Sequence, residues 1–442
     1  TFDTSSGLPG DVDGDGTSDL PASITNRLNN NRIAVANQIS TSGLAVTALS
    51  RDDYQTFAIS VGLSGGVAGS IGANVNINEV TTLAHIDDGA TINGGDNSAA
   101  GTGQNVLVAA GSDFRHWGLA GGLTLSFGGA LVPGADVILY DNTTKAYIGN
   151  ATVTAKGSVN VVANSKQDIF SIAAAVAGSG GLSLAASASV QMLDNTTHAY
   201  IGTDSTADSN NHARINADGN VFVYSSDETE AYMVAGSLGI GIGAVGIGAS
   251  GAVSIVEKDT QAYLGDFAEV DAKADTITSM TVFDGSINST TESLFNNPTL
   301  APGTTQTFGT TTAKGVAVQA SSREDVFAIA AAGGGSLGFA LAGGVTYTTV
   351  ESDTTARIGA DARINQAAGA EPAQSVNVAA VNDFTAMTVG GGIGLGAAGL
   401  AGGVDVGIVM NNTSAAIGSR AQVNAQGDVK VYALSGKDID SM

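Results

Sequence analysis

The sequence lacks cysteine altogether, has little positive charge and contains no long uninterrupted apolar segment. Without cysteine the chain has no disulfide bonds, no thiol nucleophile and no zinc site built on thiolates. Lys and Arg number 17 against 41 Asp and Glu, so the formal net charge is −24. Nucleic-acid binding needs cations that neutralise phosphates, which argues against a nucleic-acid partner. Every apolar run is interrupted by Gly, Ser or Thr well before about 18 residues, so we predict no transmembrane segment.

What the sequence does contain is a repeat, seen most clearly in residues 158–202. The unit opens with a Val-x-Val strand, runs through two strands of small apolar residues joined by Gly-Ser-Gly-Gly, and closes on Thr-x-Ala-x-Ile-Gly. Repeats of this kind indicate a stacked, quasi-one-dimensional fold. The second Val of the opening strand anchors the copies at Val46, Val108, Val161, Val223, Val318, Val378 and Val431. The spacings between these anchors are 62, 53, 62, 95, 60 and 53 residues.

Alternation of Val, Ile and Leu with small or polar residues predicts β-strands throughout the repeats. We therefore predict an all-β fold, an elongated β-solenoid resembling a parallel β-helix, with about six units of 53–62 residues. A unit of this length would form two or three coils of such a helix. The alternative is a stack of antiparallel β-hairpins, because the Gly-Ser-Gly-Gly breaks are also suitable hairpin turns.

The chain divides into three regions on this basis. Residues 1–43 form an Asp-rich leader with one short helix or lead-in strand within 23–39. Residues 44–427 form the solenoid, and residues 428–442 begin a further, incomplete repeat. The 95-residue spacing reflects an insertion at 275–314, rich in Thr, Ser and Asn. Insertions in repeat arrays map to loops or projections, which often carry binding functions.

The central strands have one face of large residues and one of small residues. We expect the large face to fill a core and the small face to let another sheet approach closely. In the copy at 182–192 the large face consists of Leu182, Leu184, Ala186, Ala188, Val190 and Met192. The small face consists of Ser183, Ala185, Ser187 and Ser189.

Acidic residues recur after each Val-x-Val strand, where we predict a turn. Stacked units would align these residues as an acidic ridge. The ridge either binds calcium between units or is a solvated surface that keeps the body soluble. We favour the solvated surface. The residues are Asp52, Asp53, Asp113, Asp168, Asp227, Glu228, Glu230, Glu324, Asp325, Asp383 and Asp438.

The leader contains a candidate calcium site. Asp11, Asp13, Asp15 and Asp19 follow the spacing of an Asp-rich calcium loop, and Gly16 supplies the tight turn. Ca²⁺ prefers several oxygen ligands, which such a loop brings together. Ala22 stands where a complete EF-hand has its bidentate Glu, so the loop resembles the short calcium loops of bacterial surface proteins. We predict one structural Ca²⁺ at this loop.

The closing motif predicts a column of side chains on one strand face. The residue between Ala and Ile or Leu should stack from unit to unit, in the order His85, Tyr147, Tyr200, Tyr263, Arg357 and Ala416. We expect the three tyrosines to stabilise the sheet as a ladder. The same row is also a possible binding strip, because exposed tyrosines stack on sugar rings.

The sequence offers no catalytic constellation. The four histidines have no HExxH or paired spacing, and no Gly-x-Ser-x-Gly elbow lies between a strand and a helix. Carboxylate pairs recur once per unit, which indicates architecture rather than a single active site. We therefore predict a protein without enzymatic activity, with a polysaccharide-cleaving β-helix as the weakest alternative.

Taken together, the Val-x-Val strands, the Gly-rich apolar strands and the Thr-x-Ala-x-Ile-Gly motif over residues 44–442 resemble the repeats of large Gram-negative surface adhesins. These are the filamentous-haemagglutinin-like and leukotoxin-type filamentous adhesins. The resemblance implies a secreted, extracellular stalk that attaches to cells, surfaces or glycans, or to copies of itself. A second function that fits the repeats is a self-assembling subunit of an extracellular filament or biofilm matrix fibre.

Overall fold

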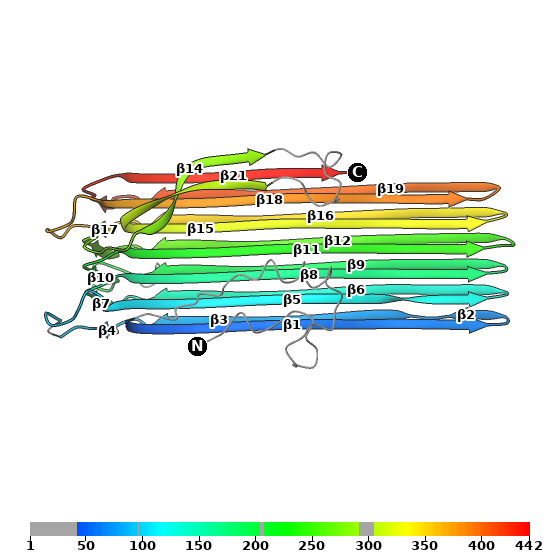
Figure 1. The fold of residues 1–442 in the computed structure, drawn as a ribbon, viewed down its shortest axis with the longest axis horizontal. Coiled ribbons are helices and arrows are strands. Elements are labelled where there is room, and N and C mark those ends of the chain that lie inside the picture. Colours follow the sequence, from blue (N-terminus) through cyan, green and yellow to red (C-terminus); the bar gives the residue numbers. More distant parts are fainter. Residues whose placement is uncertain (1–41, 96, 204–206, 291–304) are drawn as a thin grey trace.

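The computed structural model describes residues 42–95, 97–203, 207–290 and 305–442. Within these ranges the chain forms strands and turns without any helix, and hence no helix suited to crossing a membrane. Apart from one antiparallel strand of the insertion, the strands belong to three parallel sheets, which the chain visits in a fixed order before it rises to the next coil (Figure 1). The predicted all-β solenoid is confirmed.

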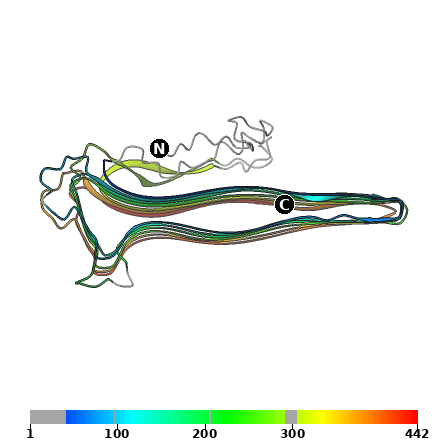
Figure 2. The same cartoon turned by 90° about the horizontal axis from the view of Figure 1, so that it is seen from below.

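Two sheets of long strands form the broad faces of the molecule, and a sheet of short strands closes it at one end (Figure 2). Sheet A consists of β1 (Gly43–Ser64), β5 (Asn105–Ser126), β8 (Val159–Ser179), β11 (Val221–Gly241), β15 (Thr305–Ser336), β18 (Gln374–Leu395) and β21 (Val429–Ser441). Sheet B consists of β2 (Val67–Gly69), β3 (Gly72–Ile86), β6 (Gly129–Ile148), β9 (Leu182–Ile201), β12 (Val245–Leu264), β16 (Phe339–Ile358) and β19 (Ala398–Ile417). Sheet C consists of β4 (Thr91–Ile92), β7 (Thr152–Ala155), β10 (Arg214–Ala217), β13 (Glu269–Ala272), β17 (Arg363–Ile364) and β20 (Gln422–Val423).

Each sequence repeat makes one coil. The anchor valines pair in parallel register, as Val46 with Val108 and Val108 with Val161. The expectation of two or three coils per unit is wrong, because strands of 21 and 20 residues, as in β8 and β9, use most of a unit. The antiparallel alternative is also wrong, because the strands that flank each Gly-rich turn lie in different sheets and pair in parallel with neighbouring coils.

The molecule has the shape of a flat blade. At about 3.3 Å per residue the long strands span roughly 70 Å, whereas seven coils spaced about 4.8 Å apart stack to roughly 30 Å. We call the end that carries sheet C proximal and the opposite end, where sheet A turns into sheet B, distal (Figure 2). The distal turns hold two residues in five coils and three between β11 and β12. Differences in unit length therefore fall near sheet C.

The strands of sheet A run without interruption through the acidic segments. The prediction of a solvated turn after each Val-x-Val strand is wrong, because the parallel ladder with the neighbouring coils continues across these residues. Alternate acidic residues point to opposite sides of the sheet, so Asp227 and Glu324 are buried between the sheets. All the residues concerned lie within strands: Asp52, Asp53, Asp113, Asp168, Asp227, Glu228, Glu230, Glu324, Asp325, Asp383 and Asp438.

The proximal half encloses an apolar core between the three sheets. Val161 of sheet A, Ile201 of sheet B and Val153 of sheet C are fully buried in one cluster that extends through the described coils. Burying each such side chain contributes roughly 1.5–3 kcal/mol. Equivalent residues of successive coils pair with one another. Every coil therefore adds the same kind of contact to the core.

In the distal half the two broad sheets approach so closely that only small side chains fit between them (Figure 2). Ser183, Ala185, Ser187 and Ser189 of β9 point inward and are buried, which confirms the predicted close approach. The large face lies outside, with Leu182 51% and Met192 42% exposed. The prediction that the large face fills a core is therefore wrong.

The insertion at 275–314 folds back onto the blade. Its strand β14 (Met280–Thr290) pairs antiparallel with the first part of β15, as Val282 with Thr311. Met280 and Val282 pack against Ala317 of sheet A. The hairpin thus covers part of the outer face of sheet A toward the proximal end (Figure 2).

Replacing Gly239 with Ala should lower the free energy of unfolding by about 1–3 kcal/mol, the usual range for overpacking. A Cβ atom on Gly239 of β11 would lie 2.0 Å from the backbone oxygen of Ile247 in the facing sheet B. The matched control is Gly236→Ala, whose Cβ would meet no atom within 4 Å and which removes the conformational freedom of glycine. Denaturant unfolding measures both, and equal stabilities would contradict the close approach of the sheets.

Candidate functional site

The predicted column of closing-motif residues is present on the outer face of sheet B. We call His85, Tyr147, Tyr200, Tyr263 and Arg357 the tyrosine column; Ala416 continues the register. The ring centroids of His85 and Tyr147 are 4.9 Å apart, and those of successive tyrosines are 4.8 and 4.7 Å apart. The Arg357 guanidinium lies 4.3 Å from the Tyr263 ring centroid.

Stacking leaves the tyrosine edges, rather than their faces, toward solvent. The planes of Tyr147 and Tyr200 differ by 2° and those of Tyr200 and Tyr263 by 1°, so each ring covers its neighbour. Burial is the main cause that raises the pKa of Tyr200 to about 12, and the nearby Tyr147 and Asp88 raise it further. The phenols of Tyr147, whose pKa is also raised by burial, and Tyr200 therefore stay neutral at physiological pH. The use of this row as a binding strip stays a prediction.

A second column on sheet B consists of carboxylates, and we call it the acidic column. Glu79, Asp141, Asp194, Glu257 and Glu351 pair in register and are exposed. Burial, then the charges of Asp141 and Asp259, raises the pKa of Asp194. The column marks the boundary between the polar proximal face and the apolar distal face of sheet B.

Between the sheets lies a buried ionic cluster that the sequence did not reveal. The Lys258 Nζ atom of β12 lies 2.8 Å from Asp227 Oδ1 and 3.1 Å from Glu324 Oε1, and all three side chains are fully buried. Lys258 also donates to the backbone oxygens of Asp227 and Arg323. Burial alone would lower the pKa of Lys258, but the two carboxylates outweigh it and raise the pKa, so the ammonium stays charged.

Hydroxyl and amide groups complete this cluster. Glu324 accepts hydrogen bonds from Ser322 at 2.6 Å and from Ser352 at 2.8 Å, and Asn382 donates to its other oxygen at 3.1 Å. Thr197 donates to Asp227 at 2.7 Å. Both carboxylates are thus paired with a cation and hydrogen-bonded on all sides, and the cluster links sheets A and B. Because the cluster is buried, it offers no surface to a ligand in this structure.

His116 and Asp136 form a further buried polar pair toward the distal half. Their Nε2 and Oδ2 atoms are 3.7 Å apart, and both side chains are fully buried. Ser171 donates to Asp136 at 2.5 Å and exchanges a 2.7 Å hydrogen bond with Ser189. The residue types are those of a nucleophile and its base, but both side chains are enclosed between the sheets in this structure.

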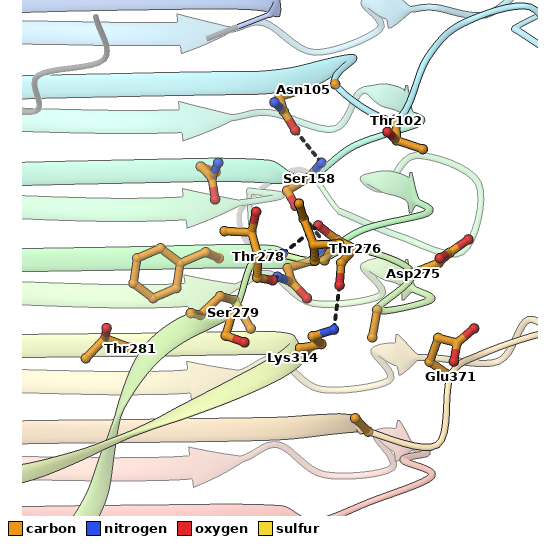
Figure 3. Close-up of a pocket in the computed structure, with 18 of the residues that line it drawn as sticks. Thr102, Asn105, Ser158, Asp275, Thr276, Thr278, Ser279, Thr281, Lys314 and Glu371 are labelled. Carbon is orange, nitrogen blue, oxygen red and sulfur yellow. Dashed lines mark hydrogen bonds between the residues drawn. The ribbon is translucent and has the colours of Figure 1, made fainter. Parts of the chain in front are cut away.

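An open groove of about 1000 Å³ lies where the insertion leaves the proximal end of sheet A (Figure 3). Its walls are mainly hydroxyl and amide groups, with one cation, Lys314, which donates to the Thr276 backbone oxygen. Asp275 and Glu371 lie at its margin (Figure 3). Such a lining suits a neutral polar ligand. The prediction that the insertion is a place for binding is not tested by this geometry alone.

A ladder of polar side chains builds the floor of this groove. Asn105 accepts a hydrogen bond from the Ser158 N–H at 2.7 Å, Ser158 from the Asn220 N–H at 3.0 Å, and Asn220 from the Gly315 N–H at 2.9 Å. Each residue directly precedes an opening Val-x-Val strand. That repeated Asn or Ser was the signal by which the ladder could have been found.

The proposed calcium ligands Asp11, Asp13, Asp15 and Asp19, and the segment 23–39, lie outside the described residues. Among the residues that are described, no group of three or more His, Asp or Glu side chains is arranged to hold a metal ion. The structural Ca²⁺ at residues 11–19 stays a prediction.

Comparison of the chain with protein-family models, with curated proteins and with solved structures finds no match. The resemblance to filamentous adhesins therefore stays an interpretation of the repeat itself.

Replacing Lys258 with Met should lower the free energy of unfolding by about 3–5 kcal/mol, because Asp227 and Glu324 would stay buried without their cation. Lys156→Met is the matched control. Lys156 pairs with Asp218 at 2.9 Å on the surface, where solvent screens the ion pair, so its loss should lower the stability far less. Thermal and denaturant unfolding distinguish the two, and comparable losses would contradict a special role for the buried cluster.

The triple replacement of Tyr147, Tyr200 and Tyr263 by Ser should destabilise the blade by roughly 0.2–1 kcal/mol for each stacked pair lost. The triple replacement by Phe keeps the stacked rings and should keep the stability. Melting curves of both variants test this. A Phe variant as unstable as the Ser variant would assign the stabilisation to the hydroxyls instead of the stacking.

Proposed function

We propose that this chain is a non-catalytic structural segment of an extracellular bacterial surface protein, a stalk with a role in attachment. The observation that carries the proposal is the in-register stacking of one coil per repeat, because such a body lengthens by adding coils without changing its design. The resemblance of the repeats to filamentous adhesins supports the same reading and the secreted location.

The last coil supports growth by stacking. Among the described strands, β19 and β21 pair on one side only. Their inward residues are left exposed, Ile417 to 36% and Val431 to 40%, although the equivalent Ile358 and Val378 are buried by the coil that follows them. A further coil, from the same chain or a neighbouring one, would bury these apolar side chains and pair the edge.

Attachment is supported by the polar surfaces of the proximal half. The tyrosine column presents a row of neutral hydroxyl edges, and the groove beside the insertion is lined by hydroxyl and amide groups. Both suit a glycan or another polar cell-surface ligand. The non-catalytic role is supported by the burial of His116, Asp136 and Lys258, whose chemistry is enclosed in the body.

The same open edge favours a second candidate, a self-assembling subunit of an extracellular fibre. Head-to-tail stacking of identical chains does not close on itself and so produces an open filament. The difference between the two candidates is whether the stack continues within one chain or between chains.

A tandem duplication of residues 375–427, which make up one coil, tests the stacking on which both candidates rest. The longer chain should melt at a higher temperature than the wild type, because each added coil contributes one more interface. A lower melting temperature would overturn the proposal. Negative-stain microscopy of both chains then separates the candidates: single blades identify the stalk, and fibres whose length grows with protein concentration identify the filament subunit.

A further inference from the structure

The outer surfaces of the distal half are apolar on both sides of the blade. We call the outward side chains between the charged rows and the distal turns, together with the turns themselves, the apolar tip. On sheet A they include Leu63, Leu125, Ile240, Ile393 and Leu395, which are 42–70% exposed. On sheet B they include Ile77, Leu131, Leu182, Leu341 and Val404, which are 39–75% exposed. The turns add Phe127, Ile242 and Leu337.

Outward charge is excluded from this part of every described coil. Residues 54–78, 169–193, 231–256 and 326–350 contain no Asp, Glu, Lys or Arg. In residues 384–409 of the last coil the one such residue is Asp405, which pairs in register with the inward Thr346 and accepts hydrogen bonds from Thr346 and Thr388. In the equivalent residues 116–140 the one such residue is Asp136, which points inward and is fully buried. The apolar tip is therefore continuous from coil to coil.

Charged rows border the apolar tip at matching heights on the two faces. On sheet B the border is the acidic column. On sheet A it is the row Asp53, Arg115, Asp168, Glu230 and Asp325. The next outward row of sheet A, just inside this border, is aromatic in the four coils that carry Trp117, Phe170, Tyr232 and Phe327, with Gln55 and Met387 at its two ends. Aromatic residues between a charged and an apolar zone are typical of protein surfaces at the membrane interface.

The apolar tip is too large for a surface that faces water. Six strands about 4.8 Å apart and about eleven residues long cover roughly 1,000 Å² on each face, whereas the largest apolar patch of a soluble monomer is usually about 300–600 Å². Burial of this area would be strongly favourable. Some apolar partner must therefore cover it.

We propose that the distal half of the blade inserts into the hydrocarbon of a lipid bilayer, with its strands along the bilayer normal. From Ile169 to Ser179, strand β8 rises roughly 36 Å beyond its charged border, which spans the roughly 30 Å of a bilayer core. The charged rows then lie among the headgroups. The distal turns are short and free of charge, and backbone hydrogen bonds join them from coil to coil, as from the Gly180 N–H to the Ser126 oxygen and from the Gly243 N–H to the Gly180 oxygen, which lowers the cost of their passage through hydrocarbon.

The backbone of the inner coils meets the main requirement for insertion. Each strand from β5 to β18 in sheet A pairs in parallel with a coil on both sides, so its N–H and C=O groups are satisfied before they meet lipid. Most Ser and Thr hydroxyls of the distal half point between the sheets, away from the acyl chains, as those of Ser183, Ser189 and Thr346 do. Thr349 is an exception, in register with the outward Ile255 and Ile408 next to the acidic column. The open edges of the outermost described coils would cost free energy in lipid, so a further coil on either edge favours insertion.

The outer face of sheet A also contains an apolar groove of a size that fits an acyl chain. Gly333 and Gly335 of β15 have no side chain between Ile240 of β11 and Ile393 of β18. They form the floor of an apolar groove of about 500 Å³ that runs along the strands. An acyl chain aligned with the bilayer normal would lie along this groove.

A lipid partner explains the apolar turns better than a second copy of the chain does. Face-to-face pairing of two blades would cover one broad face and leave the other face exposed, together with Phe127, 82% exposed, and Leu337, 75% exposed. Immersion in hydrocarbon covers both faces and the turns at once. The inference is independent of the proposed stalk, because it concerns the faces of the blade and not its stacking edges.

The test is flotation of the full chain with phosphatidylcholine vesicles in a density gradient, after dilution from urea into the vesicle suspension. The wild type should float. The triple variant Val176→Lys, Leu238→Lys, Ile240→Lys places three outward charges in the apolar tip, and its vesicle-bound fraction should fall by at least about tenfold. Circular dichroism checks that the variant is still β-rich, as expected for exposed positions.

A matched control places the same three charges on the outer face of proximal sheet B, as Gln261→Lys, Thr355→Lys, Ser414→Lys. It should float like the wild type, since these positions stay in water. If the tip variant and the control lose flotation equally, added charge rather than the apolar tip controls binding, and the proposal is overturned.

The absence of native cysteine allows a single probe to report depth. An environment-sensitive fluorophore on Leu238→Cys should shift to the blue with vesicles and be quenched by nitroxides on lipid tails, whereas one on Thr154→Cys of sheet C should do neither. A wild type that stays unbound, or that forms lipid-independent oligomers in which Leu238→Cys is shielded, would overturn insertion. Such oligomers would assign the apolar tip to a second copy of the chain.

Discussion

The hydrogen-bonded ladder between successive coils is the constraint on which the rest of the structure depends. Parallel strands pair residue by residue over 20 positions or more. Each side chain therefore lies about 4.8 Å from the equivalent side chain of the next coil. Valines become a continuous core, tyrosines become a stacked column, and carboxylates become a charged row. The ladder does not distinguish between favourable and unfavourable neighbours, so like charges such as Asp141 and Asp194 are also held side by side.

The ladder also explains how polar groups are tolerated deep inside the blade. Lys258 and Asp227 lie on the two broad strands of one coil, β12 and β11, and Glu324 lies on β15 of the next coil, so the cluster joins both sheets and two successive coils. Toward the distal end the same facing sheets are held apart by little more than serine, alanine and glycine. The blade is thus built around ionic contacts in its middle, apolar contacts at its proximal end and backbone proximity at its distal end.

Sequence patterns predicted the features that depend on period alone. The alternation gave all-β strands, and the alignment of closing motifs placed His85, Tyr147, Tyr200, Tyr263 and Arg357 in one column. Patterns did not decide which strand face is inside, because Leu182 and Ser183 alternate in the same way in either orientation. They also did not separate a turn from a strand at Asp227, because the partner that stabilises this carboxylate, Lys258, lies 31 residues away. The same alternation hid the apolar tip, since the small residues that interrupt each apolar run face the opposite sheet.

The unequal spacing of the repeats has a structural meaning. Distal turns hold two or three residues in every complete coil, and the long strands keep nearly the same length, so units of 53, 62 and 95 residues differ only around sheet C. The distal turn varies by a single residue: the extra one between β11 and β12 is taken up within the turn, and both ladders keep their register. The proximal end accepts far longer segments, as the hairpin of β14 and β15 shows. Growth of a unit is therefore concentrated where the broad sheets lead into sheet C.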